Sequence, residues 1–210
     1  VTGFTIGERV TGEGHIACGQ CRNCRRGRNH LCEKTIGIGV NRDGAFAEFV
    51  SVPASNVMKI NPSIPDEIVS LMDPLGNATH TTLSYPIIGE DVLITGAGLI
   101  GSLCIAIARF AGARNVIATE TNEFRRQLAT NFGANKVIDP LNETLDEVLR
   151  EYKMHGFDIG LECSGSHIAL NDMVSHMYNS GKISILGIPP AQTAIDWHHV
   201  IFKGLTIKGI

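Results

Sequence analysis

The chain has 210 residues, of which 43% are hydrophobic and 19% charged, and its formal net charge is -3. This length allows one large domain or two small ones, and the composition is that of a globular protein with a sizeable core. The mild acidity gives no reason to expect nucleic acid or an anionic membrane as a partner, and no apolar run reaches the roughly 18 residues that span a bilayer. The composition therefore predicts neither kind of partner.

Short apolar runs separated by turn residues occupy residues 1–60. The stretches "ERVTGEG", "AFAEFVSV" and "NVMKI" have the alternation of short β-strands. Residues 65–85 are predicted to be largely helical, with a break near Pro74 and Gly76.

Four cysteines lie close together between the first two predicted strands, separated by two, two and seven residues. They are Cys18, Cys21, Cys24 and Cys32. Disulfides fit poorly, because two-residue gaps make strained loops and nothing suggests secretion. Bacterial iron–sulfur runs have a last gap of about three residues followed by proline, whereas here seven residues precede Cys32 and Glu33 follows it. The pattern predicts zinc held by four thiolates, a closed and therefore structural site.

Arginines surround the cysteines and can offset the charge of a four-thiolate zinc site. They are Arg22, Arg25, Arg26 and Arg28. The alternative is a zinc ribbon on nucleic acid, which the absence of interleaved aromatic residues disfavours. The remaining cysteines, Cys104 and Cys163, lie in apolar runs and are predicted to be small core residues without an obvious partner. This cysteine usage predicts a reducing compartment, the cytoplasm.

From Glu90 onward, apolar strands alternate with helical patterns. The predicted strands are "DVLIT", "NVIAT", "KVID", "FDIGLEC", "KISILGI" and "LTIKGI". Helices are predicted between them, and Asn122 and Gly133 cap and close the second one. Such alternation, with near-continuous apolar strands, predicts an α/β fold with a doubly wound parallel sheet of the Rossmann type.

A glycine-rich loop, Gly96-x-Gly98-x-x-Gly101, joins the first of these strands to its helix. In this context the glycines allow a tight turn, close approach of a pyrophosphate, and close packing of helix against strand. Glu120 ends the second strand 19 residues after Gly101, where a carboxylate binds ribose hydroxyls and repels a 2′-phosphate. The loop therefore predicts a dinucleotide site that prefers NAD to NADP. Arg125 could flank the adenine ribose, and a plain surface arginine fits equally well.

Several stretches together resemble the zinc-dependent medium-chain alcohol dehydrogenases. They are "GEGHIACGQCRNCRRGRNHLC", "IGVNRDGAFAEF", "DPLGNATHT", "GAGLIG", "LGIPP" and "IDWHHVIFKGLTIKG", and within the family they are most similar to the enzymes that act on L-threonine. The resemblance implies part of a β-rich, GroES-like catalytic domain over residues 1–70, which carries the structural zinc. It implies an NAD-binding domain over residues 71–210, in a piece of a longer protein cut at both ends.

The implied activity is oxidation of the L-threonine 3-hydroxyl by NAD to 2-amino-3-ketobutyrate, helped by a catalytic zinc that polarises the substrate oxygen. The family's usual cysteine and Gly-His-Glu ligands for that zinc do not occur in these residues, and we expect them upstream. The chain by itself is therefore expected to be inactive. The alternatives are a zinc-dependent polyol or secondary alcohol dehydrogenase and a non-catalytic NAD-binding sensor.

The resemblance also implies roles for residues outside the two motifs. Asp73 would lie beside the catalytic zinc and His15 near the substrate; a helix-capping aspartate and a surface histidine are the alternatives. The two are too far apart in sequence to predict a zinc site of their own. Ile100 would cover the dinucleotide or simply pack in the helix core. The nicotinamide carboxamide would meet the backbone of Leu186, Gly187 and Ile188.

Members of the family often pair the last strand of the sheet between two subunits. The resemblance therefore implies a homo-oligomer, a dimer or tetramer, in which "LTIKGI" is the edge strand at the interface.

Overall fold

The computed structural model describes residues 2–210, which form two compact units: the first ends at Asp73, and the second runs from Pro74 to Ile210. Within the described residues, no helix is both long and apolar enough to cross a membrane. The division of the chain into a catalytic domain ending at residue 70 and a nucleotide-binding domain stays a prediction.

The first unit is built from short strands and single helical turns. Strand β1 (Val10–Gly12) pairs antiparallel with β4 (Val57–Lys59), and β2 (His15–Ile16) pairs antiparallel with β3 (Ile36–Gly37). Three 3-10 turns cover Cys24–Arg26, Asn29–Leu31 and Ala54–Asn56. The strands predicted in "ERVTGEG" and "NVMKI" are confirmed, and the loop with the four cysteines lies between β2 and β3.

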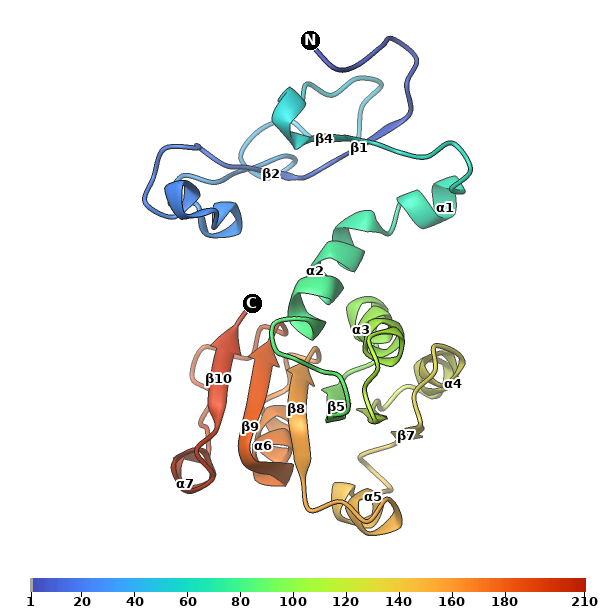
Figure 1. The fold of residues 1–210 in the computed structure, drawn as a ribbon, viewed down its shortest axis with the longest axis vertical. Coiled ribbons are helices and arrows are strands. Elements are labelled where there is room, and N and C mark those ends of the chain that lie inside the picture. Colours follow the sequence, from blue (N-terminus) through green and yellow to red (C-terminus); the bar gives the residue numbers. More distant parts are fainter. Residues whose placement is uncertain (1) are drawn as a thin grey trace. The chain divides into compact units, whose positions relative to one another are not determined.

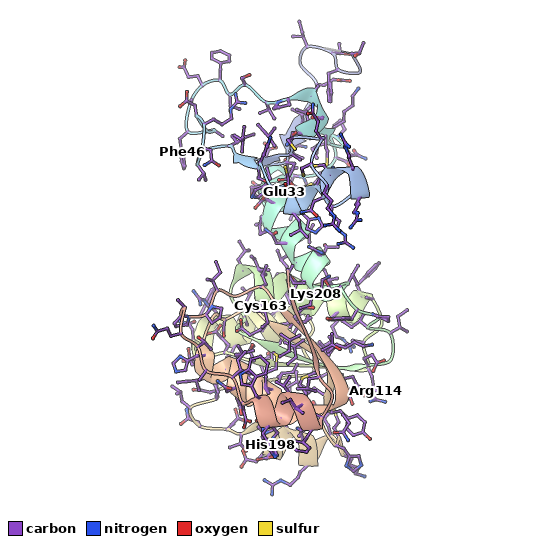
Figure 2. All side chains as sticks on the ribbon, turned by 90° about the vertical axis from the view of Figure 1, so that its left-hand side faces the viewer. Glu33, Phe46, Arg114, Cys163, His198 and Lys208 are labelled. Atoms are coloured by element: carbon purple, nitrogen blue, oxygen red, sulfur yellow. The ribbon has the colours of Figure 1, made fainter. Side chains whose placement is uncertain are left out.

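The strand predicted in "AFAEFVSV" is wrong: residues 44–52 have irregular backbone. Its aromatic side chains are exposed: Phe46 is fully exposed (Figure 2), and Phe49 is 89% exposed. A strand needs a neighbour for its backbone hydrogen bonds and a surface for its apolar face. Among the described residues this segment has neither, so the alternation of apolar residues alone does not make it a strand.

The helical segment after β4 consists of α1 (Asp66–Val69) and α2 (Met72–Thr82). The predicted break at Pro74 and Gly76 is wrong, because α2 continues through both. Pro74 is the third residue of α2, in the first turn, where backbone N–H groups have no partner within the helix. The interruption falls at residues 70–71 instead.

The second unit contains a six-stranded sheet in the order β10-β9-β8-β5-β6-β7, with every pair parallel (Figure 1). Its strands are β5 (Asp91–Thr95), β6 (Asn115–Thr119), β7 (Lys136–Ile138), β8 (Phe157–Glu162), β9 (Met177–Ile185) and β10 (Thr206–Gly209). The strand order reverses direction between β5 and β8. Ligands of open α/β sheets bind at such a switch point, outside the carboxyl ends of the strands.

Helices cover both faces of this sheet. They are α3 (Leu99–Phe110), α4 (Glu123–Asn131), α5 (Leu145–Glu151), α6 (His167–His176) and α7 (Trp197–Phe202). Val92 and Ile94 of β5 pack in one core cluster with α3 and α4, whereas Leu93 packs in a second cluster with α5 and α6. Successive side chains of a strand point to opposite faces, so the doubly wound parallel sheet is confirmed.

A buried carboxylate ties three strands together at their amino ends. Asp91, 3% exposed at the start of β5, accepts hydrogen bonds from Arg114 Nε (2.8 Å) and Nη2 (2.6 Å) and from Asn115 Nδ2 (2.8 Å). Its own backbone N–H donates to Asp158 Oδ2 on β8, at 2.8 Å. A buried carboxylate needs such partners because an unpaired buried acceptor is unfavourable, so this cluster holds β5, β6 and β8 side by side.

Candidate functional site

The glycine loop follows β5 at the switch point, and each glycine meets a different steric demand. Gly96 has a φ of +83°, and a Cβ there would lie 2.8 Å from the Cα of Ser164. A Cβ on Gly101 would lie 1.9 Å from the carbonyl oxygen of Gly96. Gly98 precedes α3 as its N-cap and faces open space, so a ligand can approach the backbone at the helix N-terminus. This arrangement suits a pyrophosphate.

Glu120 lies just after β6, with 8% of its surface exposed. Its Oε2 accepts the backbone N–H of Ala97 in the glycine loop at 2.9 Å, and its Oε1 accepts the N–H of Asn122, also at 2.9 Å. An ionised carboxylate has about four acceptor positions, so these two bonds leave capacity for ribose hydroxyls. The bond to Ala97 connects the glycine loop directly to the residue predicted to bind the ribose.

A cleft of about 760 Å³ contains Gly96, Gly98, Glu120 and Arg125 in its lining. Arg125 lies in the first turn of α4, where its backbone N–H is capped by Asn122 Oδ1 at 3.1 Å. The opposite wall comes from the segments after β7 and β8 and from α5 and α6. The structure therefore brings four of the predicted dinucleotide residues together around one cavity. That they bind NAD stays a prediction.

A second buried carboxylate, Glu162 at the end of β8, was missed from the sequence. It is 1% exposed, and its Oε1 accepts the backbone N–H groups of Ser164 (2.8 Å) and Gly165 (3.0 Å), the Ser164 hydroxyl, and the hydroxyl of Thr95 (3.3 Å). These bonds hold the turn that faces the glycine loop. The sequence feature that could have indicated it is a glutamate near the end of the apolar stretch "FDIGLEC". Strands β8 and β6 flank β5, so Glu162 at the end of β8 corresponds to Glu120 at the end of β6.

The residues predicted to meet the nicotinamide follow β9. The backbone N–H groups of Leu186 and Gly187 each donate to the Glu162 carbonyl at 3.0 Å, and Ile188 is exposed. None of the three is part of the cleft lining. Ile100 in α3 packs, partly buried, against the core, which favours the helix-core interpretation. The assignment of the three backbones to the carboxamide stays a prediction.

In the first unit, the four cysteine sulfurs lie within 4.8 Å of one another. Tetrahedral zinc with Zn–S bonds of about 2.3 Å requires sulfurs about 3.8 Å apart. Backbone N–H groups point at the sulfurs: Cys18 N donates to Cys32 Sγ at 3.3 Å, and Cys21 N to Cys18 Sγ at 3.4 Å. Four soft donors at this spacing fit zinc.

The electrostatic surroundings of the four thiols differ. The backbone N–H of Cys24 lowers the pKa of Cys21 to about 6, whereas desolvation raises the pKa of Cys24 to about 12. Amide hydrogen bonds of this kind favour the thiolate, which is the form that binds metal.

Glu13, His15 and Asp73 form a second group, with one ligand atom from each within 4.8 Å of the others. His15 and Asp73 are therefore close together in space although they are far apart in sequence, and the expectation that they form no zinc site of their own stays a prediction. Glu13 was missed: its Oε1 lies 2.7 Å from both the Nδ1 and the backbone N of His15. All three residues are exposed. The signal for Glu13 was its position two residues before His15 in "GEGH".

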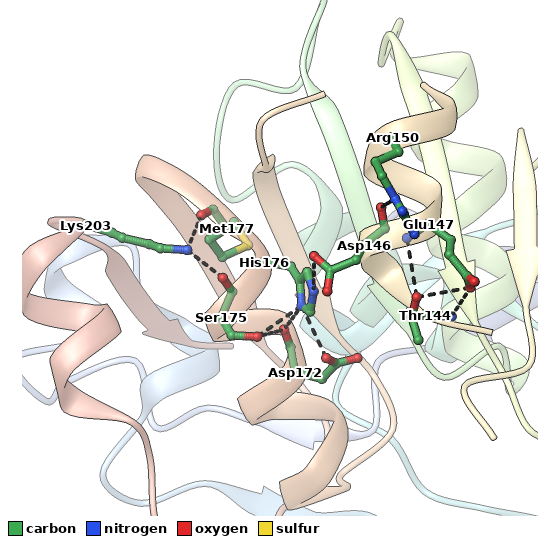
Figure 3. Close-up of polar contacts among 9 residues, drawn as sticks. All are labelled: Thr144, Asp146, Glu147, Arg150, Asp172, Ser175, His176, Met177 and Lys203. Carbon is green, nitrogen blue, oxygen red and sulfur yellow. Dashed lines mark hydrogen bonds and ion pairs between the residues drawn. The ribbon is translucent and has the colours of Figure 1, made fainter. Parts of the chain in front are cut away.

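The cleft of the second unit also contains a histidine that joins two helices (Figure 3). His176, at the end of α6, has its Nδ1 2.7 Å from the Asp172 carbonyl and its Nε2 3.6 Å from Asp146 Oδ1 on α5. Burial lowers the pKa of His176, but the hydrogen bonds and charge of Asp172 outweigh burial, so the pKa is raised. This histidine contributes to the packing of α5 against α6.

Comparison with known families places both units. The sequence matches the zinc-binding dehydrogenase family over residues 100–210 and the alcohol dehydrogenase GroES-like domain over residues 1–62. A curated relative from Burkholderia vietnamiensis, named L-threonine 3-dehydrogenase, is 57% identical over the whole chain. The chain spans 62% of the length of that relative.

Solved structures show the same fold. A zinc-binding dehydrogenase from Sinorhizobium meliloti, bound to NADP, is 31% identical with a TM-score of 0.92, and the match covers 100% of this chain and 63% of that one. Galactitol-1-phosphate dehydrogenase from Escherichia coli is 26% identical with a TM-score of 0.90, covering 100% of this chain and 62% of the other.

Proposed function

Because the chain belongs to the zinc-binding dehydrogenases, we propose that the whole protein oxidises L-threonine at its 3-hydroxyl and transfers the hydride to NAD. The product of this reaction is 2-amino-3-ketobutyrate. The observation that carries the proposal is the cleft at the switch point, where the glycine loop and Glu120 are joined by the 2.9 Å hydrogen bond from Ala97.

NAD is the proposed cofactor because a carboxylate borders the cleft where the adenosine ribose would bind. A 2′-phosphate placed against Glu120 would meet like charge in a largely buried setting, which is unfavourable. The S. meliloti neighbour was solved with NADP, and the preference of this chain is tested directly below.

L-threonine is the proposed substrate on two grounds. The relative that is 57% identical carries that activity in its name. In addition, Glu13 and Asp73 place two carboxylates beside His15, a setting that complements the ammonium group of an amino alcohol better than the neutral hydroxyls of a sugar alcohol. Electrostatic complementarity of this kind contributes to specificity.

The chemistry of the chain's own residues follows from these positions. Gly98 and the start of α3 would hold the pyrophosphate, and Glu120 the ribose, which fixes the cofactor at the carboxyl ends of the strands. Glu13 holds Nδ1 of His15, which leaves Nε2 to accept or donate a proton. A catalytic zinc, when bound, would supply polarisation of the substrate hydroxyl; of the residues here, Asp73 would lie nearest to it. The four cysteines would hold a second, structural zinc.

The direct test is NADH formation by the whole protein with L-threonine, compared with sorbitol and galactitol 1-phosphate. We expect turnover with L-threonine and a kcat/KM at least 100-fold lower with either polyol. The second candidate, a polyol dehydrogenase, is favoured by the fold match to galactitol-1-phosphate dehydrogenase. Turnover of a polyol with none of L-threonine would replace the substrate and leave the cofactor assignment standing.

We also propose that the protein is a cytoplasmic homo-oligomer, a dimer or tetramer. All six cysteines are free thiols, as expected in a reducing compartment. Strand β10 is the last strand at one edge of the sheet, and an edge strand can pair with a second copy. Light scattering of the whole protein gives its mass, and a monomer at micromolar concentration would contradict the assembly.

A further inference from the structure

Two cysteines outside the zinc-binding loop meet in the second unit. The sulfurs of Cys104 and Cys163 are 4.0 Å apart, although the residues are 59 positions apart in sequence. Cys104 is completely buried in α3, and Cys163 follows β8 directly. The expectation that neither has a partner is therefore wrong. The Cys104 sulfur also lies 3.7 Å from the Ala78 carbonyl and is hydrogen-bonded by the Thr82 side chain.

The pair lies at the base of the proposed dinucleotide cleft. Cys163 is partly exposed and lines the cleft together with Gly96 and Gly98 (Figure 2). A Cβ on Gly101 would lie 3.5 Å from the Cβ of Cys163, so the start of α3 packs directly against this cysteine. A small oxidant in the cleft can reach Cys163, whereas Cys104 can be reached only through its neighbour.

The two thiols differ in acidity. The contact between the two sulfurs lowers the pKa of the Cys104 thiol, while the same contact and burial raise the pKa of Cys163. The inner thiol therefore loses its proton more readily, and its sulfur is in contact with the outer one. A thiolate in contact with a second sulfur is the arrangement from which a disulfide closes.

We propose that Cys104 and Cys163 form a reversible disulfide when a hydroperoxide enters the empty cofactor cleft. The partly exposed Cys163 thiol is first oxidised by hydrogen peroxide to a sulfenic acid, with release of one water. The second sulfur then displaces hydroxide from the sulfenic acid, which leaves with a proton as a second water. Two thiols and one hydrogen peroxide thus give one disulfide and two waters.

Closing the bond would change the cofactor cleft. An S–S bond is about 2.05 Å long, so the two sulfurs must approach by about 2 Å. Because Cys104 lies within α3 and Cys163 lines the cleft beside Gly96 and Gly98, this movement would shift the start of α3 relative to the glycine loop. We expect at least a tenfold loss of NAD affinity. This effect rests on the proposed function, whereas formation of the disulfide does not.

The experiment uses the zinc-loaded chain treated with hydrogen peroxide, alkylated under denaturing conditions and digested without reductant. We expect a disulfide-linked pair of peptides that contain Cys104 and Cys163. Its mass should be two hydrogen atoms less than the sum of the two free peptides, and dithiothreitol should separate them. Saturating NAD should slow its formation. Calorimetric titration before oxidation, after oxidation and after reduction gives the affinity, and zinc content is measured in each sample to show that the cysteine cluster of the first unit is intact.

Cys104→Ala is the matched variant, and Cys163→Ser is the second should the buried substitution prevent folding. Both should keep their NAD affinity after peroxide. Absence of the linked peptide while other thiols are oxidised, or linkage of Cys163 to a different cysteine, overturns the proposal. If the linked peptide forms and the affinity for NAD does not fall, the proposed effect of the disulfide on cofactor binding is wrong. A chain that binds no NAD before oxidation counts against the proposed function, and the peptide map still decides the disulfide.

Discussion

Glu120 Oε2 accepts the backbone N–H of Ala97 at 2.9 Å, so the residue that ends β6 is bonded to the loop that ends β5. The two halves of the proposed dinucleotide site, phosphate and ribose, are therefore coupled through one carboxylate. A substitution at position 120 acts on both.

Replacing Glu120 with Gln should weaken NAD binding by about 10- to 100-fold, because hydrogen bonds to a charged group contribute about 1.5–3 kcal/mol. The neutral side chain should also reduce the discrimination against NADP. Calorimetric titration with both cofactors measures this. Glu123→Gln, an exposed carboxylate in the first turn of α4, is the matched control and should leave both affinities unchanged. Equal affinity of the parent for NAD and NADP would refute the role given to Glu120.

The cysteine cluster should contain one zinc per chain and no iron. Cys21→Ser removes one of four ligands, and the loop between β2 and β3 should lose its metal and its order, because structural zinc contributes about 10–16 kcal/mol to the folding of small modules. Metal analysis and proteolysis within residues 18–32 report on this. Cys163→Ser changes a cysteine of the other unit and should retain full zinc content. Unchanged melting and proteolysis in a metal-free Cys21→Ser chain would show that zinc does not stabilise the loop.

Glu13→Gln in the whole protein should lower kcat with L-threonine by about tenfold, less than the roughly 100-fold or more that a general acid–base group itself contributes, because Glu13 acts through His15. The amide can present an N–H to His15 Nδ1, which competes with the tautomer that the carboxylate fixes through the 2.7 Å contact. The affinity for NAD should not change. Glu8→Gln removes a carboxylate of the same unit that pairs with Lys59, and should have normal turnover. If both variants lose activity alike, the effect is on the unit as a whole.

His176 should make the second unit more stable at low pH. Its pKa is raised in the folded chain, so the folded state binds the proton more tightly than the unfolded state does. This stabilisation is fully present below the unfolded pKa of about 6.5 and is lost as the pH rises through the raised value.

The test compares melting temperatures of the parent and His176→Gln at about pH 6 and about pH 8. The difference between them should be larger at the lower pH, where the protonated histidine stabilises the folded chain. The exposed residue His155 provides the control variant, His155→Gln, which should follow the parent at both values. A difference that is independent of pH would mean that His176 acts only through packing.

The sheet was predictable from sequence because its strands are short apolar runs between helices with clear signals, such as the Asn122 cap and the glycine loop. The first unit was less so. "AFAEFVSV" has the right alternation, but a strand depends on a partner that no local pattern reveals. The break predicted at Pro74 is wrong because a proline is tolerated in the first turn of a helix, and the sequence does not show that α2 begins at Met72. The sequence did not predict the roles of Glu13 and Glu162 or the contact between Cys104 and Cys163. Each follows from which residues the fold brings together, and the spacing of residues along the chain does not give this.

The cluster around Asp91 gives the two ends of the sheet different tolerance to sequence change. At the amino ends, Arg114 and Asn115 are bonded to a nearly inaccessible carboxylate, and a substitution there damages the scaffold itself. At the carboxyl ends, Arg125 and Ile168 border an open cleft, and we expect substitutions there to change ligand binding more than folding. Cofactor preference could therefore be changed, by engineering or by evolution, through substitutions at the carboxyl ends of the strands. The cluster around Asp91 at the amino ends would keep the sheet folded.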